Sequence, residues 1–179
     1  MKKTVLLLSL VAFTSVLFAQ TKKTTSATVA FDATTPKDAL PKAENKTVIA
    51  EIDTKSGQIG FEAAVKNFTF TNPTIQAHFN EERWLNSDKF PAFTFMGKIA
   101  DVTKYNFSKN GVYNVTVTGQ LTIKDKTNNV TTPATIEVKN GALIANASFS
   151  IVLADYGIQV GTAGKIAGEP KITVAAELK

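Results

Sequence analysis

Apolar and polar residues alternate along most of the chain, which is typical of strands that bury one face. The longest such stretch is 112–124, where apolar residues hold the odd positions and polar residues hold most of the even ones. Three further segments alternate in the same way: 130–139, 143–151 and 171–179. Asn140-Gly141 joins two of them and is a strong hairpin signal. The second half of the chain therefore predicts four strands with one apolar face each.

The first half of the chain repeats this pattern in shorter pieces. Apolar residues share one parity within each of these segments: 27–31, 48–52, 59–65 and 93–99. Near Lys66-Asn67 the apolar positions change parity, because Phe68 and Phe70 are even-numbered. A slip of one residue reverses the two faces of a strand, so we expect a bulge or a strand break there. The tally is about eight strands, with short turns at 109–111, 125–129 and 140–141.

One segment departs from the alternation and predicts a helix. Asn72-Pro73 provides an N-cap followed by proline at the first helical position. Ile75 and Phe79 then fall four residues apart, on one face of a short helix. Phe90-Pro91 ends this excursion, so residues 73–89 are expected to cover one end of the sheet.

The fold class that follows is all-β. Antiparallel strands with one apolar face must bury that face, and one short helix cannot cover them all. Closure into an extended eight-stranded barrel buries the face and removes the exposed edges, and a sandwich is the alternative. The inner face carries several small residues that leave space: Ala63, Gly119, Ala134, Ala145, Ala147 and Ala176. A barrel of this size either encloses one small ligand or is packed solid.

The N-terminal residues have the composition of a targeting segment. Lys2 and Lys3 precede the mostly apolar run Thr4–Phe18, and the small residue Ala19 follows. This order is that of a secretory signal peptide, which we assign to residues 1–19. A membrane anchor is the alternative, but fifteen residues span only ~22 Å as a helix, less than a bilayer core. Residues 20–26 are polar and predict a flexible leader before a barrel domain at 27–179, in a periplasmic or secreted protein.

The composition of the chain excludes several kinds of catalytic, metal and nucleic-acid-binding site. The chain has 179 residues, with 20 Lys+Arg against 15 Asp+Glu, one His and no Cys. Lack of Cys excludes disulfides, thiolate metal sites and cysteine nucleophiles, and a single His excludes sites that need two imidazoles. The positive excess is spread along the strands, whereas a nucleic-acid-binding protein shows a concentrated basic stripe. We therefore predict no nucleic-acid partner, no metal and no cofactor.

Four ordered pieces of sequence carry a family resemblance. They are His78–Phe95, Gly119–Ile123, Val130–Val138, and Phe149–Ile151 followed by Asp155–Ile158. In this order they resemble the YceI family of secreted lipid-binding proteins, over roughly residues 27–179. The resemblance implies a lipocalin-like antiparallel barrel that holds a polyisoprenoid or another long-chain amphiphile, and it implies no catalysis. The chain departs from the family where Lys124-Asp125 replaces a frequent His-Gly turn, and where the first strand lacks its usual His.

With this resemblance, large apolar residues become candidates for the lining of a barrel lumen. The predicted lining residues are Phe61, Phe68, Phe70, Phe79, Trp84, Phe93, Phe95, Val117, Leu121, Phe149 and Ile151. The predicted contacts of a polar headgroup are His78, Arg83, Lys89 and Lys124. The alternative for the lining residues is a packed core. The alternative for the headgroup contacts is that they are solvated surface charges.

The sequence predicts no catalytic residue. Gly161–Lys165 imitates a phosphate loop, but its spacing is wrong, and no G-x-S-x-G motif occurs. The predicted function is sequestration of a long-chain lipid, without a membrane span once the signal peptide is removed. The alternatives are a ligand-free barrel that acts as a structural or interaction module, and a small outer-membrane barrel. An enzyme would depend on His78, the one imidazole. The sequence does not indicate an oligomeric state.

Overall fold

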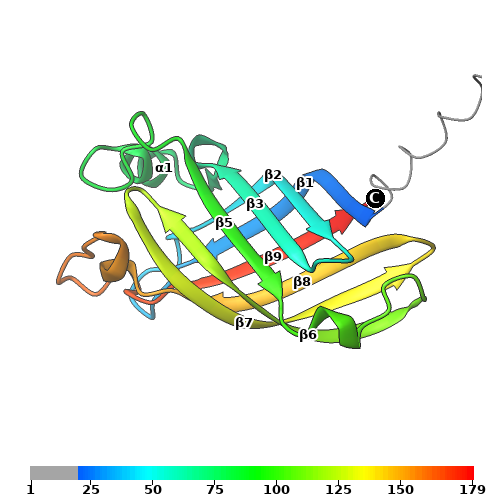
Figure 1. The fold of residues 1–179 in the computed structure, drawn as a ribbon. Coiled ribbons are helices and arrows are strands. Elements are labelled where there is room, and N and C mark those ends of the chain that lie inside the picture. The colour runs from blue at the N-terminus through cyan, green and yellow to red at the C-terminus, as the bar shows by residue number, and fades with distance from the viewer. Residues whose placement is uncertain (1–19) are drawn as a thin grey trace, which may run out of the picture.

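A computed structural model describes residues 20–179 (Figure 1), so the predicted signal peptide lies outside the described residues. The strands are β1 (Thr21–Asp32), β2 (Lys42–Asp53), β3 (Gln58–Ala64), β4 (Thr69–Phe70), β5 (Ala92–Ile99), β6 (Gly111–Ile123), β7 (Lys126–Lys139), β8 (Ala142–Ser150) and β9 (Lys171–Leu178). The helices are α1 (Pro73–Asn80) and the short 3₁₀ helices η2 (Val65–Asn67), η3 (Val102–Lys104) and η4 (Leu153–Tyr156). Among residues 20–179, none of these helices has the length and apolar composition to cross a bilayer.

Eight of the strands close into an antiparallel barrel. Their order is β1-β9-β8-β7-β6-β5-β3-β2, and β2 pairs with β1 to complete the ring. The two-residue strand β4 pairs only with β2, outside this ring. The predicted eight-stranded barrel with one short helix is therefore confirmed. Figure 1 shows α1 at one end of the barrel and the C-terminus at the other.

The predicted alternation is seen in the burial of the strands. In β6 the side chains of Val115 and Val117 are buried, whereas Thr116 and Thr118 are exposed on the outer face. The Asn140-Gly141 turn is also confirmed, because both residues have positive φ angles and the strands pair directly beside them. Positive φ at both central residues is the geometry that fits the twist of a two-residue hairpin.

The turn between β6 and β7 is tighter than the sequence predicts. Ile123 pairs with Lys126, so the connection is Lys124-Asp125, with Lys124 at a φ of 57°. The predicted turn over residues 125–129 is wrong, because polar residues 126–129 extend β7 and pair with β6. Polarity alone does not distinguish a loop from an exposed strand, and here the backbone of β6 pairs with the polar run.

The flexible leader predicted for residues 20–26 is corrected by the structure in the same way. Thr21 pairs with Asp53 and Thr24 with Ala50, so β1 begins far ahead of its apolar residues. Lys23 also exchanges backbone hydrogen bonds of 3.2 Å with Lys179. None of the side chains of residues 20–26 is buried, which explains why the segment has no apolar signal.

The change of parity after β3 has the predicted cause. The 3₁₀ helix η2 interrupts the chain at Val65–Asn67, and Val65 and Phe68 on its two sides are both buried. Val65 and Phe68 are three positions apart, so the apolar positions Phe68 and Phe70 after η2 are even-numbered whereas those of β3 are odd-numbered. The expected strand break is therefore confirmed.

The turn between β2 and β3 gives a pH-dependent prediction. The carboxylate of Asp53 accepts hydrogen bonds from Ser56 N (2.7 Å), Ser56 Oγ (2.9 Å) and Lys55 N (3.0 Å). These bonds, the one from Ser56 N first, hold the pKa of Asp53 below its ordinary value. A lowered folded-state pKa contributes stability above the unfolded-state pKa of about 3.9, and this contribution is lost as pH falls through the folded-state pKa.

We therefore expect Asp53→Ala to lower the free energy of unfolding by about 1 kcal/mol near neutral pH and by less at about pH 3. Urea denaturation at the two pH values measures the difference. Asp125→Ala is the control, because among the described residues no side-chain hydrogen bond is seen for this exposed turn aspartate. Equal losses for Asp53→Ala at both pH values would contradict the role of the charge.

Candidate functional site

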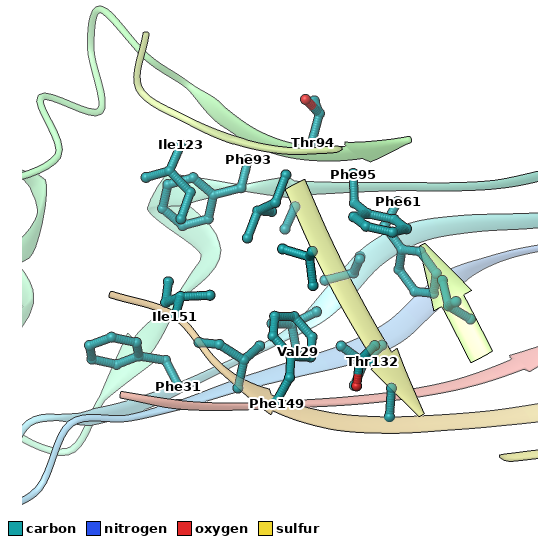
Figure 2. Close-up of a pocket in the computed structure, with 18 of the residues that line it drawn as sticks. Val29, Phe31, Phe61, Phe93, Thr94, Phe95, Ile123, Thr132, Phe149 and Ile151 are labelled. Atoms are coloured by element: carbon teal, nitrogen blue, oxygen red, sulfur yellow. The ribbon is translucent and has the colours of Figure 1, made fainter. Parts of the chain in front are cut away.

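The barrel encloses a cavity of about 160 Å³, which we call the lumen. All eight strands of the ring contribute to its wall, and Figure 2 shows side chains such as Val29, Phe61 and Phe149 pointing into it. Several of these side chains, including Phe61, Phe93, Phe95 and Phe149, are only partly buried although they face inward. Their accessible surface faces the lumen, so the interior of the barrel is hollow here.

The lumen does not run through the whole barrel. At the end opposite α1, buried apolar side chains pack against one another and do not line it: Ile99, Val115, Val138, Leu143 and Leu178. Two of these residues, Leu143 and Leu178, are paired neighbours in β8 and β9. The lumen therefore occupies the middle of the barrel and the end near α1, and it is closed at the other end, which we call the filled end.

The wall of the lumen is apolar almost throughout. Its polar residues are Thr94, Thr132 and Asn146. The hydroxyl of Thr94 points away from the lumen (Figure 2), and Asn146 is exposed. The hydroxyl of Thr132 donates to the carbonyls of Pro133 (3.0 Å) and Ser148 (3.5 Å). None of the described residues on this wall is ionisable, so the lumen suits a hydrocarbon and offers no acid, base or charged group to one.

A pair of glycines keeps one side of the lumen open. Gly97 and Gly119 face each other across β5 and β6. A Cβ atom on Gly119 would lie 2.6 Å from Phe95 Cζ and 2.6 Å from Gly97 Cα. The ring of Phe95 therefore lies against the wall, over the two glycines, and takes less of the lumen than a ring that points inward.

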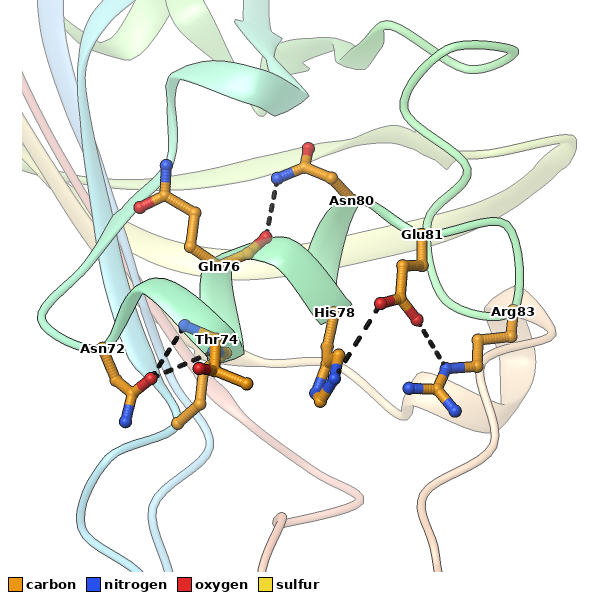
Figure 3. A network of polar contacts seen from close by, with 8 residues as sticks. Asn72, Thr74, Gln76, His78, Asn80, Glu81 and Arg83 are labelled. Atoms are coloured by element: carbon orange, nitrogen blue, oxygen red, sulfur yellow. Dashed lines mark hydrogen bonds and ion pairs between the residues drawn. The ribbon is translucent and has the colours of Figure 1, made fainter.

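Helix α1 is fixed over the open end of the barrel by aromatic packing. Phe79 is buried, and its ring centroid lies 4.9 Å from that of Phe70, 5.8 Å from that of Phe68 and 6.2 Å from that of Phe31. As predicted, Asn72 caps the helix, with its side-chain oxygen accepting from the amides of Thr74 and Ile75 (Figure 3). The helix thus closes much of this end without sealing it.

A second cavity of about 190 Å³, the vestibule, lies beside α1. It shares Phe31, Phe79 and Trp84 with the lumen, so these three side chains stand where the two cavities meet. The other residues that line it are Asp38, Pro41, Phe70, Ile75, His78, Arg83, Lys165 and Ile166. Unlike the lumen, the vestibule combines apolar side chains with charged ones.

Arg83 and His78 approach the same carboxylate (Figure 3). The distances are 2.7 Å from Arg83 Nε to Glu81 Oε2 and 3.8 Å from His78 Nε2 to Glu81 Oε1. All three side chains are between two fifths and about two thirds exposed, so water screens these contacts. Among residues 20–179, no cluster of His, Cys, Asp or Glu could hold a metal ion.

The structure brings the predicted lining residues together with one exception. All of them except Phe70 line the lumen, and Phe70 lies in the vestibule. His78 and Arg83, two of the predicted headgroup contacts, also line the vestibule. Their binding of a ligand stays a prediction.

Lys89 and Lys124, the other two predicted headgroup contacts, lie at neither cavity. Lys124 Nζ donates a 2.9 Å hydrogen bond to the carbonyl of Trp84 and so ties the β6–β7 turn to the segment after α1. Lys89 Nζ lies 5.2 Å from the ring centroid of Phe90. Both ammonium groups contact their own chain and line neither cavity, so the geometry adds no support for a headgroup contact by these two residues, which stays a prediction.

Sequence reasoning missed much of the lumen wall. The residues that it missed are mainly aliphatic, and include Val29, Val48, Ile52, Ile59, Ile172 and Val174. Their parity in the alternating segments already placed them on the inner face, so extending the choice beyond aromatic residues would have found them. Lys165 of the vestibule had no such signal, because it lies in a loop without periodicity.

The chain was compared with known proteins. Its sequence matches the YceI-like domain family over residues 11–178. No curated protein sequence matches it.

Solved structures with the same fold come from several bacteria. A polyisoprenoid binding domain from Saccharophagus degradans, implicated in plant cell wall breakdown, has a TM-score of 0.74 at 10% identity, with 89% of this chain and 98% of that domain covered. BcnA from Burkholderia cenocepacia has a TM-score of 0.69 at 18% identity, with 86% and 96% covered. A YCEI protein from Campylobacter jejuni has a TM-score of 0.57 at 16% identity, with 74% and 80% covered.

Proposed function

The chain belongs to the YceI-like domain family, and from this premise we propose that it is a carrier that sequesters a long-chain amphiphile in its lumen. Polyisoprenoids are our first choice of ligand. The observation that carries the proposal is the lumen itself, a continuous apolar cavity inside a barrel whose longest alternating strand, β6, exposes mainly polar residues on its outer face.

Burial of hydrocarbon supplies the affinity in this mechanism. Each CH₂ group of a ligand that leaves water for an apolar wall contributes about 0.8 kcal/mol. An apolar cavity of about 150 Å³ in another protein holds a benzene ring, so the lumen as it stands takes only part of a long chain. The rest of the chain needs the vestibule, or rotation of the partly buried rings of Phe61, Phe93 and Phe149.

The proposed contacts follow from the geometry. The lining residues of the lumen would contact the hydrocarbon, and His78 and Arg83 at the vestibule would contact a headgroup. We propose binding without catalysis, because the lumen wall offers hydrocarbon contacts and no ionisable group. The description of the Saccharophagus degradans domain as polyisoprenoid binding adds support, although at 10% identity the likeness is one of fold.

We further propose that the protein acts outside the cytoplasm, in the periplasm or secreted. This part rests on residues 1–19, which have the composition of a signal peptide. Transport, storage and protection from stress are all compatible with sequestration.

The proposal is tested by identifying what the native protein carries. We expect organic extraction of gently purified protein, followed by mass spectrometry, to yield a long-chain lipid in near-stoichiometric amount. The same extraction of protein that has been unfolded, stripped and refolded serves as the blank. Recovery of no lipid, together with failure of the refolded protein to bind any added prenyl lipid, would contradict the proposal.

A further inference from the structure

We propose that the vestibule selects amphiphiles with an anionic headgroup, of which a phosphate is the simplest, and that Arg83 and Lys165 provide this selectivity. The inference rests on the proposed function and adds the chemical class of the ligand. It concerns the vestibule rather than the lumen, and it includes Lys165, from the loop whose spacing is wrong for a phosphate-binding motif.

The first argument is the composition of the vestibule. Its floor is apolar, formed by Phe70, Ile75 and Ile166 among others, and it continues into the apolar lumen at Trp84. Its charged or ionisable side chains are those of Arg83, Lys165, His78 and Asp38. A chain that leaves the lumen therefore crosses an apolar surface and ends among charged groups, which is the arrangement that an amphiphile requires.

The second argument is the sign of the charge. Asp38 is the one acidic residue that lines the vestibule, and its carboxylate already accepts a 2.9 Å hydrogen bond from the amide of Leu40. Arg83 contacts Glu81 through Nε, and in Figure 3 its two terminal amino groups point away from that carboxylate. Among residues 20–179, Lys165 forms no ion pair. The residues that line the vestibule thus carry two cations, Arg83 and Lys165, against one carboxylate, Asp38, while Glu81 outside the lining contacts Arg83 through Nε.

The third argument is that the loop with Lys165 is held in place. Thr35 Oγ1 donates a 3.0 Å hydrogen bond to the carbonyl of Gly164, and the amide of Ala167 donates a 2.9 Å bond to the carbonyl of Ala33. These contacts on both sides of Lys165 join its loop to the segment after β1. Residues distant in the sequence therefore form one wall of the vestibule.

The fourth argument is orientation. Because the filled end is closed, a hydrocarbon chain can extend only toward the open end of the barrel. The polar group at its end then lies beside α1, where Arg83 and Lys165 are. Two exposed cations each contribute modestly, so their joint effect on affinity is about five- to tenfold at low ionic strength.

The experiment uses Trp84 as its reporter, because it is the one tryptophan of the chain and stands where the two cavities meet. Farnesol and farnesyl phosphate share one prenyl chain and differ in charge, so their affinities are compared by the emission of Trp84. We expect the phosphate to bind about five- to tenfold more tightly at about 0.01 M salt, and the ratio to approach one at about 1 M salt.

The variants Arg83→Gln and Lys165→Gln should each reduce this ratio, because each weakens the binding of farnesyl phosphate more than the binding of farnesol. Lys98→Gln, an exposed lysine on the outside of β5, is the matched control and should keep the ratio. Glu81→Gln should raise the ratio, because it frees Arg83 from its carboxylate. A merely structural role of Arg83 would alter the binding of both ligands.

The outcomes separate the two proposals. Equal affinities for alcohol and phosphate would overturn the headgroup assignment and leave the carrier function intact. Binding of neither compound would overturn both. Inorganic phosphate alone is the third arm: we expect no saturable response, and saturable binding that requires Arg83 and Lys165 would assign the vestibule to a free anion instead.

Discussion

The Ala134→Phe variant is expected to lose at least about a hundredfold in affinity for a prenyl lipid while the barrel stays folded. Ala134 lies on the wall of the lumen, opposite Ala147 in the neighbouring strand β8. A phenyl group there occupies the space of about four to six ligand carbons, each of which contributes about 0.8 kcal/mol when buried. Because the ring enters an existing cavity, we expect the stability of the protein to be unchanged or higher.

Ala175→Phe is the matched control for this substitution. Ala175 is exposed on the outer face of β9, so the same change of side chain leaves the lumen as it is. Titration with farnesol, followed through Trp84, and thermal denaturation measure the two effects for both variants. Full binding by Ala134→Phe would mean that the ligand is held somewhere other than the lumen.

The second large effect is expected from Gly119→Ala, which should lower the free energy of unfolding by about 2–3 kcal/mol. The new methyl group would lie 2.6 Å from Gly97 Cα and from the carbonyl oxygen of Met96, both backbone atoms that cannot rotate away. It would also lie 2.6 Å from Phe95 Cζ, which pushes that ring into the lumen. Loss of lumen volume should therefore accompany loss of stability.

Two comparisons test whether the contacts of the new methyl group cause the expected loss of stability. Gly161→Ala is the control, because a Cβ there meets no atom within 4 Å. A double-mutant cycle with Phe95→Leu measures the share that the ring contributes, since that change removes the ring contact and leaves both backbone contacts. Chemical denaturation gives the four free energies. If Gly119→Ala lowered the free energy of unfolding by less than Gly161→Ala does, β5 and β6 would have to separate freely at Gly97 and Gly119.

The fold was predictable because its signal is local and repeated. The alternation in β6 and β7 assigned inner and outer faces, the Asn140-Gly141 turn set one register, and the parity change before Phe68 marked η2. The start of β1 was not predictable in this way. Thr21–Thr24 carry no apolar residue, and their place in the barrel depends on backbone pairing with a strand some thirty residues away.

In the candidate site, too, residues on alternating strands were predictable, and residues placed by contacts between distant segments were not. Aromatic residues on the inner faces, such as Phe61 and Phe149, were found because parity predicts their direction. Lys124 was predicted to contact a headgroup. Its bond to the carbonyl of Trp84 could not be foreseen, because that bond joins segments that are distant in the sequence. Lys165 was missed for the equivalent reason, since hydrogen bonds from Thr35 and to Ala33 bring its loop to the vestibule. Periodicity gives the direction of a side chain along a strand and says nothing of which loops meet.

The filled end of the barrel has a kinetic consequence for a carrier. A molecule held in the lumen must depart by the same end through which its successor arrives, so exchange requires that the protein first become empty. Replacement is then a first-order process, whose rate does not increase with the concentration of competing lipid. Donor and acceptor must also approach one and the same face of the protein, beside α1, and therefore act in turn.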